Sequence, residues 1–173
     1  MHKCASNLRR AALARDERGV AAIEFAILTS LFFFVICVAM DFGALYLERS
    51  KMNEAVSGAA VNAFTSADNV SFTALPGYVR ALADDSALSV TTACNGVAGA
   101  CTNLSRSCAC LKNNGSFTAA TCGNSCTGSG VTTSSTAGYY LTVAATQTFH
   151  PIIVPRSLLE NAQITQQATV RLQ

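Results

Sequence analysis

Apolar residues follow three different patterns along this chain, and each pattern predicts a different structural element. From residue 20 to residue 40 nearly every position is apolar, a run of 21 residues. At about 1.5 Å of rise per residue, a helix of this length spans about 30 Å, enough to cross the hydrocarbon core of a bilayer. The first pattern therefore predicts a membrane-spanning helix, which includes Val20, Phe25, Leu31, Phe34 and Met40.

Beyond Met40 the pattern becomes amphipathic, and no proline interrupts it before residue 76. Apolar side chains recur at spacings of three and four, which is typical of a helix with one buried face. The two patterns together predict one long helix over residues 20–64. We expect its buried face to consist of Val38, Phe42, Leu45, Met52, Val56, Ala59 and Ala63.

The third pattern is strict alternation of apolar and polar residues in "YYLTVAATQTF" and "AQITQQATVRLQ", which predicts two half-buried strands. "ALSVTTAC" is a candidate third strand, and "LPGYVRALADDS" suggests a short helix. Pro151 and Pro155 lie between the two C-terminal strands and favour a turn or a sheet edge. The sequence thus predicts an α+β fold, in which the C-terminal half of the long helix packs on a small antiparallel sheet.

The chain divides into a leader over residues 1–19, the helix over 20–64 and a small α+β domain over 65–173, and charge distinguishes the leader from the other two. The leader is basic, whereas the remainder is almost neutral. A basic segment before a membrane helix favours a cytoplasmic N-terminus and an extracytoplasmic C-terminal domain. It argues against nucleic-acid binding, which would need a basic face on the folded part. The basic residues of the leader are Lys3, Arg9, Arg10, Arg15 and Arg18, against Asp16 and Glu17.

Six of the eight cysteines fall between residues 94 and 126, in a region rich in Gly, Ser, Thr and Asn. Such a cluster behind a membrane segment predicts disulfides in an oxidising compartment, with fifteen pairings open. The alternative is a structural zinc site, but among close pairs only Cys122 and Cys126 have the usual ligand spacing, and we expect no metal. Cys4 and Cys37 lie outside this group. The six are Cys94, Cys101, Cys108, Cys110, Cys122 and Cys126.

Residues that would support an enzyme are scarce. The chain has two histidines, of which His2 lies in the leader and His150 precedes a proline in a predicted turn. It has no G-x-S-x-G, no H-E-x-x-H and no glycine-rich phosphate loop. We therefore expect no catalytic residues, no cofactor and no small-molecule substrate.

Glu24 is the one acidic residue within the apolar run. A carboxylate in the hydrocarbon core costs about 2.5–3.5 kcal/mol on insertion scales, so a charged partner is expected. Cleavage after Gly19 would give Val20 a positively charged α-amino group at neutral pH. In side-by-side helices with an axial stagger, Glu24 of one chain would meet that amino group of the next, which compensates both charges.

"RGVAAIEFA", the apolar run behind it and "DFG" resemble the TadE-like pseudopilins of the tight-adherence (Flp-type) pilus system, with a type IV prepilin-like leader. The resemblance implies that a prepilin peptidase cuts between Gly19 and Val20, and that Glu24 and Phe25 serve assembly. It also implies anchoring in the bacterial inner membrane, with the C-terminal domain in the periplasm or in a surface pilus. The implied role is a pseudopilin or minor pilin in pilus biogenesis and bacterial adhesion. Its partners would be other pilin or pseudopilin subunits and the inner-membrane assembly platform.

A different class of protein also fits part of the sequence. Cys37, Val38 and Ala39 place small residues before a bond that an ordinary signal peptidase could cut. The product would be a secreted, disulfide-rich binding domain, and without any cleavage the same domain would stay on a membrane anchor. A mature chain starting at Val20, at Met40 or at Met1 distinguishes these three interpretations.

Overall fold

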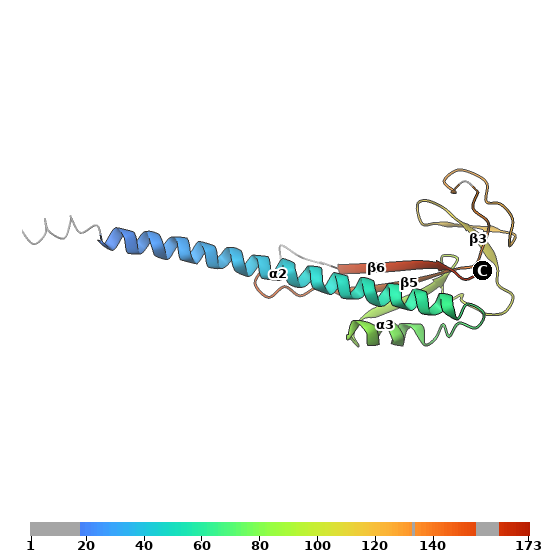
Figure 1. Ribbon diagram of the computed structural model, residues 1–173, viewed down its shortest axis with the longest axis horizontal. Coiled ribbons are helices and arrows are strands. Elements are labelled where there is room, and N and C mark those ends of the chain that lie inside the picture. The colour runs from blue at the N-terminus through green and yellow to red at the C-terminus, as the bar shows by residue number, and fades with distance from the viewer. Residues whose placement is uncertain (1–17, 133, 155–162) are drawn as a thin grey trace, which may run out of the picture.

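One helix, α2 (Arg18–Thr65), runs through most of the length of the molecule, and its C-terminal half packs against the main sheet and a short helix (Figure 1). The computed structural model describes residues 18–132, 134–154 and 163–173. At 48 residues, α2 is about 72 Å long. The predicted helix over 20–64 is confirmed, and the absence of proline lets it continue unbroken from the apolar run into the amphipathic part.

The main sheet has four antiparallel strands in the order β2-β1-β5-β6. The two strands with period-two alternation pair with each other as β5 and β6, and the third candidate strand pairs with β5 as β1. The α+β prediction is confirmed. The elements are α3 (Leu75–Ala83), β1 (Ser89–Cys94), β2 (Val97–Ala98), β5 (Tyr140–Thr148) and β6 (Gln163–Arg171).

The main core lies between the C-terminal half of α2, the short helix α3 and one face of this sheet. Small residues on α2 let α3 approach closely: a Cβ added at Gly58 would lie 3.1 Å from Cδ1 of Leu82. Most of the core is aliphatic, with one buried tyrosine. Its fully buried members include Met52, Val56, Ala59, Ala63, Val79, Leu88, Tyr139, Leu141 and Val143.

The predicted buried face of α2 is correct over its last turns and wrong near the membrane segment. Met52, Val56, Ala59 and Ala63 are buried, whereas Phe42 is 56 % exposed. Its neighbour Asp41 is turned inward instead. The reason is that the chain returning from β5 crosses α2 at this turn and supplies backbone N–H groups, which a carboxylate can bind and a phenyl ring cannot.

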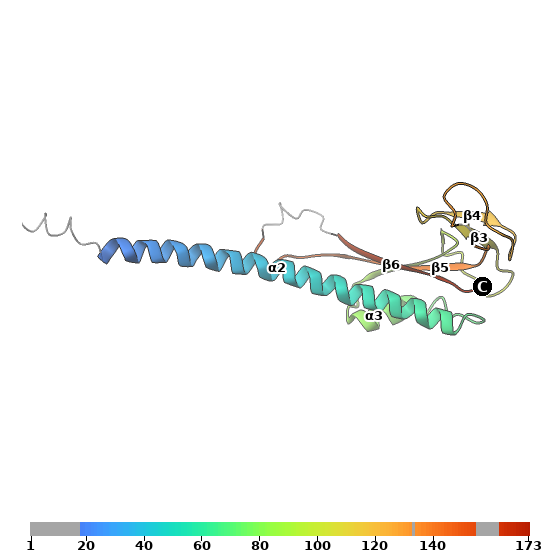
Figure 2. The same ribbon diagram turned by 45° about the horizontal axis from the view of Figure 1, so that its top comes forward.

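A second, smaller unit lies at the end of the molecule opposite the apolar run (Figures 1 and 2). We call residues 108–138 the distal lobe. It contains the hairpin of β3 (Cys108–Leu111) and β4 (Phe117–Ala120), and the buried cluster among its described residues is small: Cys108, Cys110, Cys126 and Ala137. Sequence patterns did not predict this hairpin, because its strands are short and made mostly of small residues.

All six clustered cysteines are paired, which confirms the disulfide prediction. The pairs are Cys94–Cys101 beside the main sheet, and Cys108–Cys122 and Cys110–Cys126 within the distal lobe. Cys37 is a buried free thiol, outside the disulfide framework as expected. Cys4, Pro155 and the leader up to residue 17 lie outside the described residues.

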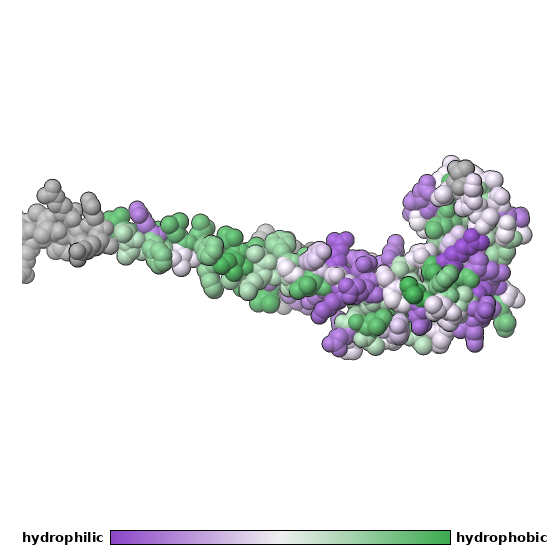
Figure 3. All heavy atoms as spheres, in the orientation of Figure 1, coloured by the Kyte–Doolittle hydropathy of each residue, from purple (hydrophilic) through white to green (hydrophobic). Residues whose placement is uncertain are grey.

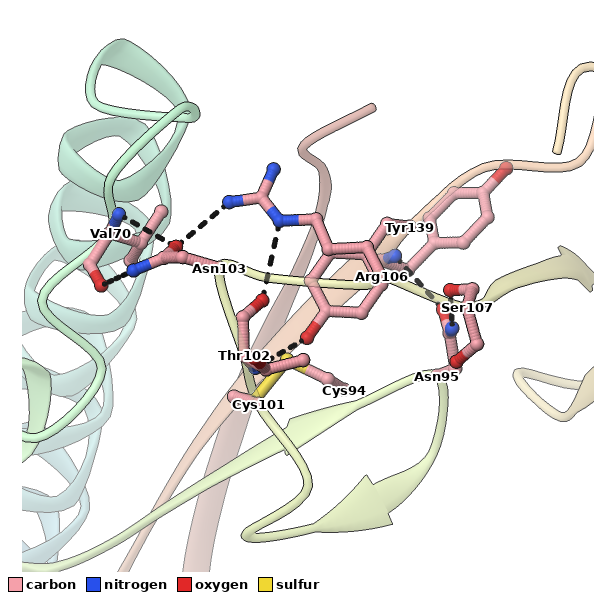
Figure 4. The surroundings of a disulfide bond; sticks show 10 residues. Val70, Cys94, Asn95, Cys101, Thr102, Asn103, Arg106, Ser107 and Tyr139 are labelled. Carbon is pink, nitrogen blue, oxygen red and sulfur yellow. Dashed lines mark hydrogen bonds between the residues drawn. A yellow bond between two sulfur atoms is a disulfide. The ribbon is translucent and has the colours of Figure 1, made fainter.

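Two side chains fasten the loop that leads into the distal lobe to the loop that follows α2 (Figure 4). The Asn103 amide accepts a hydrogen bond from the Val70 N–H at 3.1 Å and donates one to the Val70 carbonyl at 3.0 Å. The Arg106 guanidinium lies over the ring of Tyr139, 5.2 Å from its centre, and donates to the carbonyl of Ala67. The Tyr139 hydroxyl accepts the Thr102 N–H at 2.9 Å. These contacts hold the loop to the main core.

Replacing the four cysteines of the distal lobe by serine should unfold the lobe and leave the main sheet folded. The lobe has little apolar core, and each disulfide contributes about 2–4 kcal/mol. Amide hydrogen exchange should show lost protection in β3 and β4 with protection kept in β5. As a control, serine at Cys94 and Cys101 should leave the lobe protected. Equal loss of protection in β5 would contradict the separation into two cores.

Candidate assembly interface

The first half of α2 makes almost no contact with the rest of the protein. Every residue from 19 to 36 is exposed, and the large side chains are apolar, with Phe25 72 % and Leu31 61 % exposed. Figure 3 shows this half as a rod with apolar residues along its visible face, ahead of the more polar folded domain. A soluble monomer rarely exposes so much contiguous apolar surface, which is typical of a membrane or protein interaction site. The helix is long and apolar enough to act as a membrane anchor.

Gly19, Val20 and Glu24 all lie in the first turns of α2 and are exposed. The bond between Gly19 and Val20 lies near the beginning of α2, within the described part of the helix. Val20 and Glu24 are four residues apart, so their side chains lie on the same side of the helix. The pairing of Glu24 with the amino group of a neighbouring chain stays a prediction.

The end of the apolar run is marked by a buried carboxylate. Asp41 is 3 % exposed and accepts hydrogen bonds from three consecutive backbone N–H groups. The donors are Ile152 at 3.0 Å, Ile153 at 2.8 Å and Val154 at 2.7 Å. These residues belong to the return segment, which we define as residues 149–154. The segment leaves β5 and runs back along α2 toward its exposed half (Figures 1 and 2).

The sequence of the return segment explains this geometry. Pro151 has no N–H and sets the direction of the chain, so the first donors after it are those of Ile152 and its two successors. The hydrogen bond from Val154 lowers the pKa of Asp41 most, burial raises it, and the bonds from Ile152 and Ile153 lower it further. The net effect is a pKa below the usual range, so the carboxylate is ionised at neutral pH. Asp41 therefore ties the return segment to α2 at the border of the apolar run.

Sequence analysis did not single out Asp41 as a site. The available signal was an acidic residue directly after a membrane-length apolar run, but its partners lie 111 to 113 residues away in the chain. The structure brings the six cysteines together as predicted and leaves Glu24 and Phe25 free of the folded domain. Within the described ranges, no group of three or more His, Cys, Asp or Glu side chains could hold a metal ion.

Residues 19–61 match the family model described as TadE-like protein. The matched segment begins at the exposed start of α2, includes Asp41 and ends one turn before the helix does. The match confirms the resemblance to the TadE-like family over this segment, and it points to a pilin-like protein associated with the tight-adherence pilus. No curated protein and no solved structure matches the chain.

Asp41→Asn should loosen the return segment. The amide keeps one oxygen but places an NH2 donor among three N–H groups, so the amides of residues 152–154 should exchange at least about tenfold faster. The control is Asp68→Asn, an exposed acid in the loop after α2. Unchanged exchange at all three amides in Asp41→Asn would show that the carboxylate does not hold the segment.

Protonation should have the same effect as this substitution. A folded-state pKa below the usual value of about 3.9 means that the tie stabilises the folded state fully above that pH. The stabilisation is then lost as the pH falls through the lowered pKa. Amide exchange at residues 152–154, corrected for its intrinsic pH dependence, should therefore rise in wild type at acid pH and stay flat in Asp41→Asn.

Proposed function

We propose that this chain, because its long helix carries a TadE-like segment, is a pseudopilin or minor pilin needed for biogenesis of a tight-adherence pilus. The observation that carries the proposal is that this segment is a continuous helix, of which residues 19–36 are exposed and largely apolar. Such a helix needs a bilayer before assembly and other helices afterwards. The role is structural, without a catalytic site, a cofactor or a small-molecule substrate.

The proposed orientation has the leader in the cytoplasm, residues 20–40 in the inner membrane and residues 65–173 in the periplasm. The basic residues of the leader favour this direction of insertion. The three disulfides support it, because disulfides persist in the periplasm and are rare in the cytoplasm.

Processing would occur at the cytoplasmic end of α2. A prepilin peptidase would cut between Gly19 and Val20, where glycine lets the enzyme approach the backbone closely. Glu24 would then lie one turn from a new, positively charged terminus. In a staggered array of helices the carboxylate of one subunit would neutralise the amino group of the next, and Phe25 would add apolar contact beside it. The partners are other pilin or pseudopilin subunits and the inner-membrane assembly platform.

Co-expression with a prepilin peptidase should remove residues 1–19, and Gly19→Val should block this cut. A β-branched side chain at the scissile bond obstructs the peptidase and stiffens the chain. Intact-mass measurement of the mature chain reads the result directly. A chain that starts at Met40 would instead support a secreted domain with an ordinary signal peptide, and an intact Met1 would support an uncleaved anchor.

Glu24→Gln should impair association with the other pilus subunits and leave removal of the leader intact, because the charge pair exists only between subunits. Leaving one charge of a buried pair uncompensated costs about 3–5 kcal/mol, which weakens association by about a hundredfold or more. Co-purification from membranes, measured together with the extent of cleavage, separates the two effects. Glu54→Gln is the matched control, since Glu54 is an exposed acid on the folded half of the same helix. Normal association of Glu24→Gln would refute the pairing.

A further inference from the structure

The two edges of the main sheet are built differently. At one edge, β2 is only two residues long, and the Cys94–Cys101 disulfide lies beside it. At the other edge, β6 is nine residues long, and no strand of the described part of the chain pairs with its outer side. A very short edge strand hinders the addition of a strand from another chain, so the β2 edge is protected and the β6 edge is not protected in this way.

The pairing pattern shows which backbone groups β6 presents outward. The Leu172 N–H donates to the carbonyl of Tyr139 at 2.8 Å, and the Asn95 N–H donates to the carbonyl of Tyr140 at 2.9 Å. In an antiparallel ladder the direction of these groups alternates along each strand. Even-numbered residues of β6 therefore bond to β5. The odd-numbered residues direct their N–H and C=O groups to the open edge, and these are Gln163, Thr165, Gln167, Thr169 and Arg171.

This edge lacks the features that usually prevent strand addition. From Gln163 to Val170 there is no proline, glycine or charged residue, and the pairing with β5 is continuous, without a bulge. Thr165, Thr169 and Val170 are β-branched and favour extended backbone. The edge is therefore long, regular and uncharged over most of its length.

A groove of about 330 Å³ lies between α2 and the beginning of this edge. It is lined by Leu45 and Arg49 of α2 and by Gln163, Ile164 and Thr165 of β6. A strand added to β6 would direct alternate side chains toward α2, into this groove. The half-buried Leu45 offers apolar contact there, and the exposed Arg49 offers a positive charge, so the groove suits an aliphatic residue next to a carboxylate.

The direction in which β6 runs limits which chain can supply the added strand. β6 runs the same way as α2, from the apolar end toward the distal lobe (Figure 1). Antiparallel pairing is the more stable arrangement per residue. A second copy anchored in the same membrane would present its own β6 parallel to this one. Its long strand of opposite direction, β5, already has a neighbour on both sides. The antiparallel strand must then come from a different subunit.

We propose that the open edge of β6 accepts an extended segment of a different pilus subunit, antiparallel to β6, with an acidic side chain beside Arg49. The inference rests on the proposed function, because it takes the direction of the chain from a shared membrane. It adds a contact in the extracytoplasmic domain that is independent of the packing of the apolar helices.

Two proline substitutions at adjacent positions of β6 test whether the open edge binds a strand. Gln167→Pro removes an outward N–H and places a ring on the open edge, while the ladder with β5 stays complete. Ala168→Pro removes a bond to β5 and should destabilise the domain. The full chain is co-expressed with the other pilin-like subunits of its system and purified from membranes. Gln167→Pro should keep its leader cleavage and thermal stability and lose about tenfold or more of the co-purified subunit.

Thr165→Lys provides a second variant that removes no N–H group and sets a charge at the edge, which should also reduce co-purification. Normal recovery of the subunits with a folded Gln167→Pro or Thr165→Lys would overturn the proposal. The proposal also requires one carboxylate of the captured subunit whose replacement by the amide weakens co-purification with wild type but not with Arg49→Gln. A series of such replacements that finds no carboxylate of this kind would overturn it. Recovery of a second copy of this chain across β6, identified by crosslinks between edge positions, would overturn the choice of partner.

Amide exchange separates failure of this proposal from failure of the proposed function. In membranes that contain the pilus system, the amides of Thr165, Gln167 and Thr169 should exchange at least about tenfold more slowly than in membranes that contain this chain alone. Equal exchange, with wild-type chain bound to its subunits, would reject the edge and keep the function. A wild-type chain that keeps its leader and binds no pilus subunit would reject the function and, with it, the partner assigned to β6.

Discussion

A single buried carboxylate, Asp41, ties the folded domain to α2 at the border of the exposed apolar half of the helix. The return segment brings three backbone N–H groups to the border of an apolar helix, and unpaired N–H groups at such a place are costly. Asp41 accepts all three. With the segment fixed there, the chain from β5 stays beside α2, and the core around Met52, Val56 and Ala59 packs the sheet on the same half of the helix. Residues 19–36, on the other side of this tie, stay exposed.

Much of the fold could be predicted because it depends on local periodicity. A 21-residue apolar run without proline can hardly form anything but a helix, and the alternation around Val143 and Val170 leaves only a half-buried strand. Six cysteines in a region with few other apolar residues also had a clear physical interpretation, since small residues alone cannot form a stable core. These features use information within a window of about ten to twenty residues.

The remainder depends on contacts between distant residues. The choice of Asp41 over Phe42 as the inward residue follows from a chain segment 111 residues later, and no helical period contains that information. The pairing of the four cysteines of the distal lobe likewise depends on contacts between segments: Cys108 and Cys110 lie two residues apart in β3, and the segment after β4 brings Cys122 to the first and Cys126 to the second. One local signal was overlooked. Asn95 and Gly96 both have positive φ, the conformation that an Asn-Gly pair adopts in a tight hairpin, and this turn joins β1 to β2.

Because the two cores are separate, the distal lobe and the helix α2 can change independently of each other. The TadE-like match ends at residue 61, and the distal lobe, over residues 108–138, lies wholly beyond it. The lobe has a small buried cluster and two disulfides of its own, and it adjoins the end of the main sheet rather than α2. Changes on its surface therefore need not disturb the tie at Asp41 or the spacing from Glu24 to Asp41. Covering the apolar half constrains the sequence of α2, whereas the lobe, at the opposite end of the molecule, is held by its own disulfides and can change in shape without altering the helix.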